Sequence, residues 1–378
     1  MRQFCLTSAV AIALCAPAAL ARQADTKGPY KVLRTAKVGG EGSFDYIYAD
    51  EAGRRLYIPR RGTQPVAATD TTPAVAAVPG RITAFNLDTL EPVGEIPDTG
   101  GNGVAVDPRS GHGFSSSKPV SMFDTKTLKL IKKIDVGAAQ PDGIYFDAFS
   151  DKVYVFSHPT KDAIVIDPKD GTVVGTIDLG GVPEQAVSDG KGTLYVVMQD
   201  APGSVAVVDT KAMKTTAHYP FGENGGCNGL ALDKQNQVLF AACARTAAAQ
   251  PPQPGATPAP PQPMMVIMSA ADGRIFTKLP LAGSSDGAVF NPATMEAFSS
   301  HSNGTMTVVK EKSPAAFEVA QNLQTMLGAR TLTLDSSTNH LFVMSVERGP
   351  APPPPAGGGR AGQAPAIPGS FSILVIGK

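Results

Sequence analysis

The sequence predicts an all-β protein, a seven-bladed β-propeller, on the basis of three observations. Seven short apolar segments, such as NGVAVD and DGIYFD, recur at intervals of roughly forty residues. A tight turn and further short apolar segments follow each of them. Glycine and proline are abundant, with 39 and 33 residues, which suits a chain of many turns. Repeats of this length built from short strands are typical of β-propellers. The seven segments end at Asp50, Asp107, Asp147, Asp189, Asp233, Asn291 and Asp335.

Each repeat is expected to form one four-stranded blade, in chain order. The first six blades are expected at 44–97, 103–136, 143–179, 185–221, 229–281 and 287–323. The seventh, at 330–377, contains only three candidate strands, RTLTLD, HLFVMSV and FSILVIG. The segment 30–38 is similar to the fourth strand of other repeats, so we expect it to complete this last blade. Such closure would leave only short, protected sheet edges.

Three segments rich in proline, alanine and glycine interrupt the repeats, at 62–80, 246–263 and 349–369. This composition favours extended or disordered chain and cannot form a core. Each lies between the second and third strands of a blade, in blades one, five and seven. We therefore expect the insertions to lie on one face of the ring, close to one another.

The N-terminal residues 1–21 have the pattern of a secretory signal. Arg2 gives a positive start, an apolar stretch follows, and Ala19-Leu20-Ala21 matches a cleavage site. The apolar stretch is too short for a membrane span. We expect a periplasmic or secreted protein whose mature chain, 22–378, is a single propeller domain with no transmembrane segment. The 33 basic and 33 acidic residues balance, so we expect no nucleic-acid partner, and we expect a monomer.

Removal of the signal leaves only two cysteines, Cys227 and Cys243. They flank one predicted hairpin, and a turn centred on Gln235 would place them opposite each other, within reach of a disulfide. An oxidising compartment favours this bond. The alternatives to a disulfide are two buried free thiols or a catalytic or metal-binding pair.

Seven residues precede the first strands of the blades and should converge at one end of the central channel. We call this end the top, because the blade-to-blade turns lie there. The carboxylate and amide oxygens among them suit a small polar ligand or a hard divalent cation such as calcium, and no other cofactor is predicted. Turn formation alone is the alternative, because Asn-Gly and Asp-Gly are common turn dipeptides. The candidate rim residues are Asp45, Asn102, Asp142, Glu184, Asn228, Asp286 and, in blade seven, where Ala329 holds the equivalent position, the adjacent Arg330.

Four further residues of the top face are considered as candidates for binding. His158 and His301 occupy what look like matching positions at the ends of second strands, on nearly opposite sides of the ring and outside the rim. We expect no shared metal site between them. Arg60 and Arg61 precede the first insertion and are expected to be solvated surface charges, although they could bind an anionic group.

The repeats resemble the YVTN family of β-propellers, which includes YncE-like proteins. The resemblance rests on KVYVFSHPTKDAIVIDPKDGTVVGTIDLGGVPE and TLYVVMQDAPGSVAVVDTKAMKTTAHYPFG, and it covers nearly all of the mature chain. It implies an exported seven-bladed propeller with a binding role. Blade six departs from the pattern, because its third strand ends in VVKEKSP instead of an Asp-containing turn.

These observations predict a binding or scaffolding module that uses its top face to hold a small polar ligand or an exported protein. The alternative is a metal-dependent, lactonase-like hydrolase that uses the acidic top channel. A subunit that serves periplasmic redox proteins is a third hypothesis. The sequence contains no nucleophile elbow, zinc-protease motif or phosphate-binding loop, so no catalytic residue is predicted.

Overall fold

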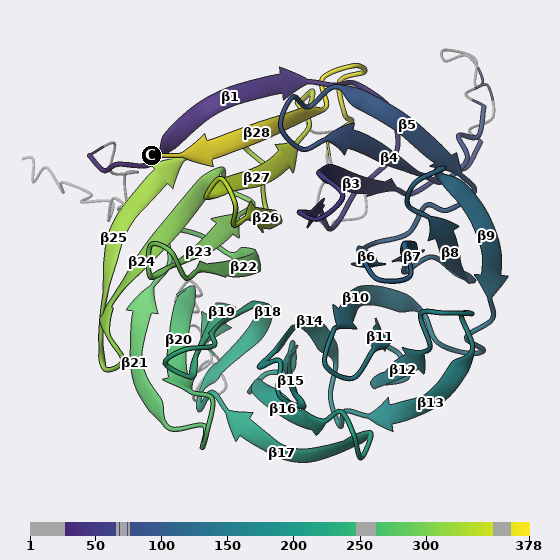
Figure 1. Ribbon diagram of the computed structural model, residues 1–378. Helices are drawn as coiled ribbons and strands as arrows, with labels where there is room; N and C mark the ends of the chain where they lie inside the picture. Colours follow the sequence, from purple (N-terminus) through teal and green to yellow (C-terminus); the bar gives the residue numbers. More distant parts are fainter. Residues whose placement is uncertain (1–26, 66–67, 69–73, 75, 247–261, 351–363) are drawn as a thin grey trace, which may run out of the picture.

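The computed structural model describes residues 27–65, 68, 74, 76–246, 262–350 and 364–378. These residues form 28 strands and no helix. The strands make seven four-stranded antiparallel sheets, arranged as blades around a central axis (Figure 1). The predicted seven-bladed β-propeller is therefore confirmed. The signal segment 1–21 lies outside the described residues, and among those described no helix is long and apolar enough to cross a bilayer.

The first four blades follow one another along the chain, and only blade one carries an insertion, between β3 and β4. Blade one contains β2 (Tyr48–Asp50), β3 (Arg55–Arg60), β4 (Arg81–Asn86) and β5 (Pro92–Pro97). Blade two contains β6 (Val104–Asp107), β7 (His112–Ser115), β8 (Val120–Asp124) and β9 (Lys129–Ile134). Blade three contains β10 (Pro141–Asp147), β11 (Lys152–Ser157), β12 (Asp162–Ile166) and β13 (Val173–Asp178). Blade four contains β14 (Pro183–Ser188), β15 (Thr193–Met198), β16 (Ser204–Asp209) and β17 (Lys214–Pro220).

The last three blades include the longest strands. Blade five contains β18 (Asn224–Asp233), β19 (Val238–Thr246), β20 (Met264–Ser269) and β21 (Ile275–Pro280). Blade six contains β22 (Ser285–Asn291), β23 (Glu296–His301), β24 (Thr305–Ser313) and β25 (Ala316–Gln324). Blade seven contains β26 (Leu332–Asp335), β27 (His340–Ser345) and β28 (Ser372–Gly377), with β1 (Lys31–Lys37) as its fourth strand. In blade six, Ser313 pairs with Ala316, so a tight hairpin replaces the Asp-containing turn of other blades.

The ring closes through the N-terminal strand, as the sequence predicts. Strand β1 pairs with β28, so the first and last strands share one sheet. Just before β1, Tyr30 packs edge-on against Phe298 of blade six and donates a hydrogen bond to Glu296. The Gln321 side chain bonds both backbone polar groups of Tyr30. The closing segment therefore also joins blade seven to blade six.

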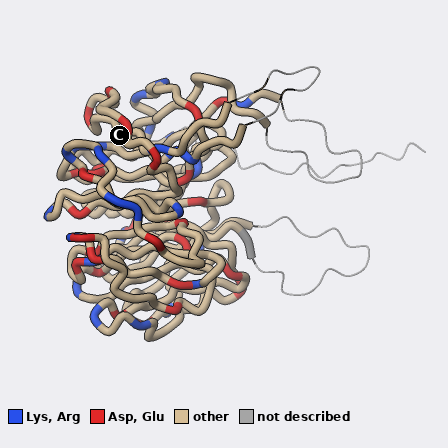
Figure 2. Tube along the Cα trace, turned by 90° about the vertical axis from the view of Figure 1, so that its right-hand side faces the viewer, with Lys and Arg blue, Asp and Glu red and all other residues tan. Residues whose placement is uncertain are grey.

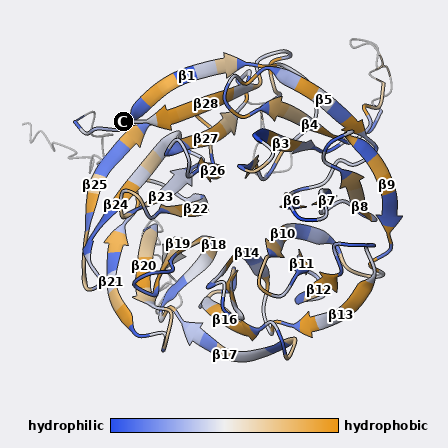
Figure 3. Ribbon diagram, viewed as in Figure 1, coloured by the Kyte–Doolittle hydropathy of each residue, from blue (hydrophilic) through white to orange (hydrophobic). Residues whose placement is uncertain are grey.

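Burial decreases from the middle of each blade to its outer edge. The second strand β11 is buried at five of its six positions, whereas the outer strand β17 alternates between exposed and half-buried residues. Outer strands β9 and β25 carry hydrophilic stretches in Figure 3. Apolar side chains of neighbouring blades form the core between them, and each fully buried Leu or Phe contributes roughly 1.5–3 kcal/mol. Successive blades thus hold the channel-facing strands in place.

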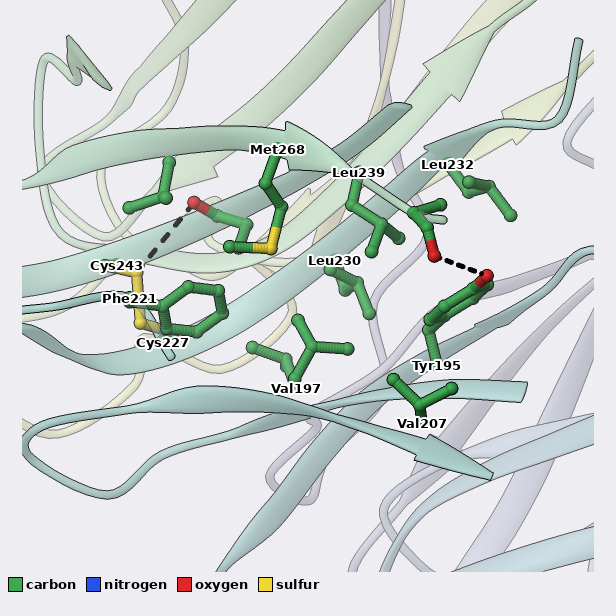
Figure 4. Close-up of a cluster of buried hydrophobic side chains, with 14 residues drawn as sticks. Tyr195, Val197, Val207, Phe221, Cys227, Leu230, Leu232, Leu239, Cys243 and Met268 are labelled. Atoms are coloured by element: carbon green, nitrogen blue, oxygen red, sulfur yellow. Dashed lines mark hydrogen bonds between the residues drawn. A yellow bond between two sulfur atoms is a disulfide. The ribbon is translucent and has the colours of Figure 1, made fainter. Parts of the chain in front are cut away.

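The interface of blades four and five contains the disulfide between Cys227 and Cys243, which confirms the predicted pair. Figure 4 shows the two sulfurs beside Phe221, with Leu230 and Met268 in the same cluster. Both cysteines are fully buried.

The hairpin that carries the cysteines has a different register from the one expected. A turn centred on Gln235 would pair Asp233 with Gln237, but Asp233 pairs with Val238, and Gln237 adopts a positive φ of 55° in the turn. A bulge between Cys227 and Gly229 then shifts the register and returns the cysteines to opposed positions.

The three insertions fall in the β3–β4, β19–β20 and β27–β28 connections, at the same end of the blades as the blade-to-blade turns. This end is the top face, and the hairpins between first and second strands form the bottom face. Most insertion residues lie outside those described. Figure 2, a side view, shows basic and acidic positions interspersed over the visible side.

Candidate functional site

The top end of the channel is shaped by β-bulges in the innermost strands of blades three to six. The strand register shifts around Asp142, Glu184, Asn228 and Asp286, which are the sequence-predicted rim positions. A bulge leaves one residue outside the regular pairing and redirects its side chain. The same irregularity therefore places a polar side chain at the channel in four successive blades.

The glycines that follow the rim residues do not serve the turns that the sequence suggested. Gly103, Gly143, Gly229 and Gly287 are not among the residues with positive φ. Instead, a Cβ at Gly229 would lie 2.6 Å from the backbone of Gly287, and one at Gly143 would lie 2.9 Å from the carbonyl oxygen of Glu184. Glycine is required there because the innermost strands of neighbouring blades approach closely. Turn formation by positive-φ glycine is therefore wrong as an explanation of these dipeptides.

All seven predicted rim residues line one cavity of about 440 Å³ at the top of the channel. Additional polar residues, which the sequence analysis did not select, also line it. The lining residues are Asp45, Tyr46, Arg61, Asn102, Gln140, Pro141, Asp142, His158, Pro159, Glu184, Gln199, Asn228, Asp286 and Arg330.

Two arginines and two aspartates form one side of this top cavity. The Arg330 guanidinium lies 2.9 Å from Asp286 and 3.3 Å from Asp45, and Arg61 lies 2.6 Å from the other oxygen of Asp45. The Arg61 side chain is still 42% exposed, so Arg61 is a partly solvated charge that is also paired with Asp45. Burial raises the pKa of Asp45 to about 6, although both arginines oppose this shift. A ligand anion could bind the same guanidinium groups.

Arg60 differs from the expectation of a solvated charge. Its side chain is 1% exposed, and its guanidinium stacks on Phe371 at 3.4 Å from the ring centroid. It donates a hydrogen bond to the Gly39 carbonyl oxygen. Burial lowers the pKa of Arg60 to about 9. Neighbouring arginines in the sequence thus have different environments, because adjacent strand residues face opposite sides.

Two asparagine amides connect the charged groups. Asn102 accepts a hydrogen bond from Arg61 and donates one to Asp142. Asn228 donates a 2.9 Å hydrogen bond to Asp286. The polar side chains of the rim are therefore held in fixed positions before any ligand binds.

His158 belongs to the opposite side of the top cavity, although the sequence predicts a position outside the rim. Its Nε2 lies 2.9 Å from Asp142 and 3.4 Å from Glu184. His301 is instead fully buried, with Nδ1 2.9 Å from the hydroxyl of Thr305, and burial lowers its pKa to about 3.

The two histidines are not at matching repeat positions, because β11 ends at Ser157 and β23 ends at His301 itself. This offset of one residue turns their side chains to different surroundings. The residue immediately after the second strand provides a signal that could have identified the site. Arg61, His158 and Gln199 all occupy this position and all line the top cavity.

Glu184 is the most buried carboxyl group of the rim. Tyr46, from the opposite side of the ring, donates a 2.5 Å hydrogen bond to it, and Gln199 donates another. Burial raises the pKa of Glu184 to about 7, and the contacts with His158 and Tyr46 act against this rise. Glu184 can therefore take up or release a proton near neutral pH.

The two carboxyl groups hold the imidazole in its charged form. Close contact with the Asp142 carboxyl group, and to a lesser extent with that of Glu184, raises the pKa of His158 to about 10. Burial acts to raise the pKa of Asp142, but the contacts with His158 and Asn102 lower it by more, so the pKa lies below its usual value. This side of the top cavity carries a protonated imidazole between two acids.

Asp142, His158 and Glu184 also form a potential metal-binding group. One ligand atom from each lies within 4.8 Å of the others. An imidazole nitrogen with two carboxylates suits zinc, manganese or iron better than calcium, which prefers oxygen ligands alone. A cation here would replace the proton on His158, because only the neutral imidazole binds a metal.

No family model and no curated protein matches the sequence. Solved structures with similar folds include a chain of Kuenenia stuttgartiensis hydrazine synthase, at 15% identity and a TM-score of 0.62, covering 79% of this chain and 91% of that one. A chain of the mitotic checkpoint complex has 11% identity and a TM-score of 0.65, with 89% and 95% covered. The Pan2 WD40 domain of Neurospora crassa has 12% identity and a TM-score of 0.62, with 92% and 95% covered. These likenesses establish the architecture: the chain is a β-propeller with WD40 domains among its structural neighbours.

Proposed function

We propose that the protein is an exported β-propeller of the YVTN type that binds a small polar ligand in its top cavity. The supporting observation is that rim residues from all seven blades converge on one cavity of about 440 Å³. Propeller folds commonly act as binding or scaffold modules, which agrees with this proposal. The signal-like segment 1–21 and the disulfide favour export.

The distribution of charge indicates the class of ligand. Arg61 and Arg330 offer donors on the side of blades one and seven. Asp142 and Glu184 offer acceptors on the side of blades three and four. A molecule that carries both an anionic group and a hydrogen-bond donor, such as an amino acid or a short peptide, complements both sides. A polar loop of an exported protein partner would present the same groups.

A binding screen tests this proposal. Amino acids, dipeptides and hydroxy acids are screened by thermal shift, and positive compounds are measured by calorimetry. Arg330→Gln should weaken binding about tenfold or more, because a hydrogen bond to a charged group contributes roughly 1.5–3 kcal/mol. Arg34→Gln is the matched control, because Arg34 is exposed on the outer strand β1. The proposal fails if no compound binds with a Kd below about 1 mM, or if Arg330→Gln binds like the control.

A second proposal is metal-dependent hydrolysis of lactones, and it rests on the group of Asp142, His158 and Glu184, whose ligand atoms lie close enough together to hold one metal ion. These residues would hold a divalent cation, which would polarise the ester carbonyl and activate water. The test is elemental analysis of the purified protein, followed by melting curves with and without EDTA and assays on a lactone panel. Stoichiometric metal whose removal abolishes hydrolysis would support this function. Absence of metal, of an EDTA effect and of hydrolysis would reject it.

A further inference from the structure

The lower half of the channel contains a second, larger cavity of about 490 Å³. The innermost strands that surround the axis in Figure 1 form its walls. In β10 it extends over four residues, from Gly143 to Phe146, which is roughly 13 Å at about 3.3 Å per residue. Ligand sites in proteins commonly have volumes of roughly 300–1,000 Å³.

The walls of this lower cavity are mainly apolar. Ile144, Phe146, Val289 and Phe290 line it and are only partly buried, although most apolar side chains in the blades are fully buried. Removing apolar surface from water is favourable by roughly 25 cal/mol per Å². The cavity walls would therefore gain stability from contact with an apolar ligand.

The upper end of the lower cavity is closed by polar side chains that already form hydrogen bonds with other protein groups. Tyr46 and Glu184 line both cavities and bond to each other across the channel. Gln185 donates to the Ala288 carbonyl and accepts from the amides of Leu230 and Ala288. An apolar chain that enters from the bottom face would end against this layer.

The mouth of the lower cavity, on the bottom face, offers one free cationic group. Glu51 accepts hydrogen bonds of 3.0 Å and 2.6 Å from the amide and hydroxyl of Ser336. Lys234 lines the same mouth and is exposed. Among the residues that the structure describes, the Lys234 ammonium has no ion-pair or hydrogen-bond partner. A negatively charged group at the mouth would find this partner available.

We propose that the lower cavity binds an amphiphilic carboxylate with an unbranched aliphatic chain. The chain lies in the apolar channel against Ile144, Phe146, Val289 and Phe290, and the carboxylate lies at the mouth beside Lys234. The depth of the cavity matches an extended decanoate chain. This site is separate from the proposed polar site of the top cavity, so either can fail without the other.

The test measures binding of octanoate, decanoate, decanol and decylamine to the full mature protein by calorimetry. Decanoate should bind more tightly than octanoate by roughly fourfold per added methylene, since each buried CH₂ contributes about 0.8 kcal/mol. Lys234→Gln should weaken decanoate at least about fivefold and leave decanol unchanged. Lys191→Gln, in the neighbouring bottom hairpin, is the matched control and should change neither.

A second pair of variants tests the position of the chain. Val289→Phe and Val187→Phe each place a larger side chain into the lower cavity from a different blade, and both should reduce decanoate and decanol binding at least about tenfold. Using two blades keeps the test informative if one variant does not fold. The proposal is overturned if neither decanoate nor decanol binds, if decylamine binds as tightly as decanoate, or if a folded Phe variant binds decanoate like the wild type.

Discussion

We predict that His158 remains protonated well above the pH at which ordinary histidines lose their charge. Its Nε2 lies between Asp142 and Glu184, at 2.9 Å and 3.4 Å. Contact with these carboxyl groups, Asp142 first, raises its pKa from 6.5 to about 10. NMR titration of the imidazole nitrogens, with the signal assigned by its loss in His158→Gln, gives the pKa directly. The five histidines of the chain make this assignment tractable.

The same shift predicts a stability change with a defined sign. Because the folded-state pKa is raised, the folded state binds the proton more tightly than the unfolded state. The stabilisation is complete below pH 6.5 and is lost as pH rises towards 10. The side chain is 34% exposed, so solvent screening reduces the effect to roughly 1–2 kcal/mol. His158→Gln should lack this loss in urea unfolding measured between pH 6.5 and 9.5.

Two results would refute the reasoning about His158. An imidazole that titrates near pH 6.5 would show that the carboxylates do not hold its proton. Parallel pH dependences of wild-type and His158→Gln unfolding would show that the charge does not contribute to stability. Both measurements are made after EDTA treatment, because a bound metal would also remove the proton.

Three further predictions concern stability, each measured by urea unfolding. The double variant Cys227→Ala and Cys243→Ala should lower the free energy of unfolding by about 3 kcal/mol, the loop-closure contribution expected for a separation of 16 residues. An unchanged free energy of unfolding would show that the disulfide does not stabilise the fold. Burial raises the pKa of Glu311 to about 7, so the folded wild-type protein must ionise a buried group as pH rises from 4.5 through 7. The wild type therefore loses stability over this range, and Glu311→Gln, which does not ionise, should become more stable than the wild type by about 2 kcal/mol. Equal pH profiles would contradict this. Tyr30→Ala should lower the free energy of unfolding by roughly 3–5 kcal/mol, because Tyr30 packs into the closing interface. A decrease below about 1 kcal/mol would show that β1 closes the ring without this side chain.

The sequence by itself determined the architecture of this protein. Seven equivalent segments imply seven equivalent blades, so the closing role of residues 30–38 and the convergence of rim residues such as Asp142 and Glu184 followed from repeat position alone. The pairing of Cys227 with Cys243 was also predictable, although a bulge compensates for an unexpected turn register.

Only the tertiary structure decided which side chains act together. His158 and His301 differ by one position relative to the ends of their strands, and this offset turns one to the top cavity and buries the other. Arg60 and Arg61 separate for the same reason. Side-chain direction in a strand changes with every residue, so small shifts of register and bulges reverse it. The contact of Tyr46 with Glu184 across the channel depends on the closed ring, which no local pattern in the sequence encodes.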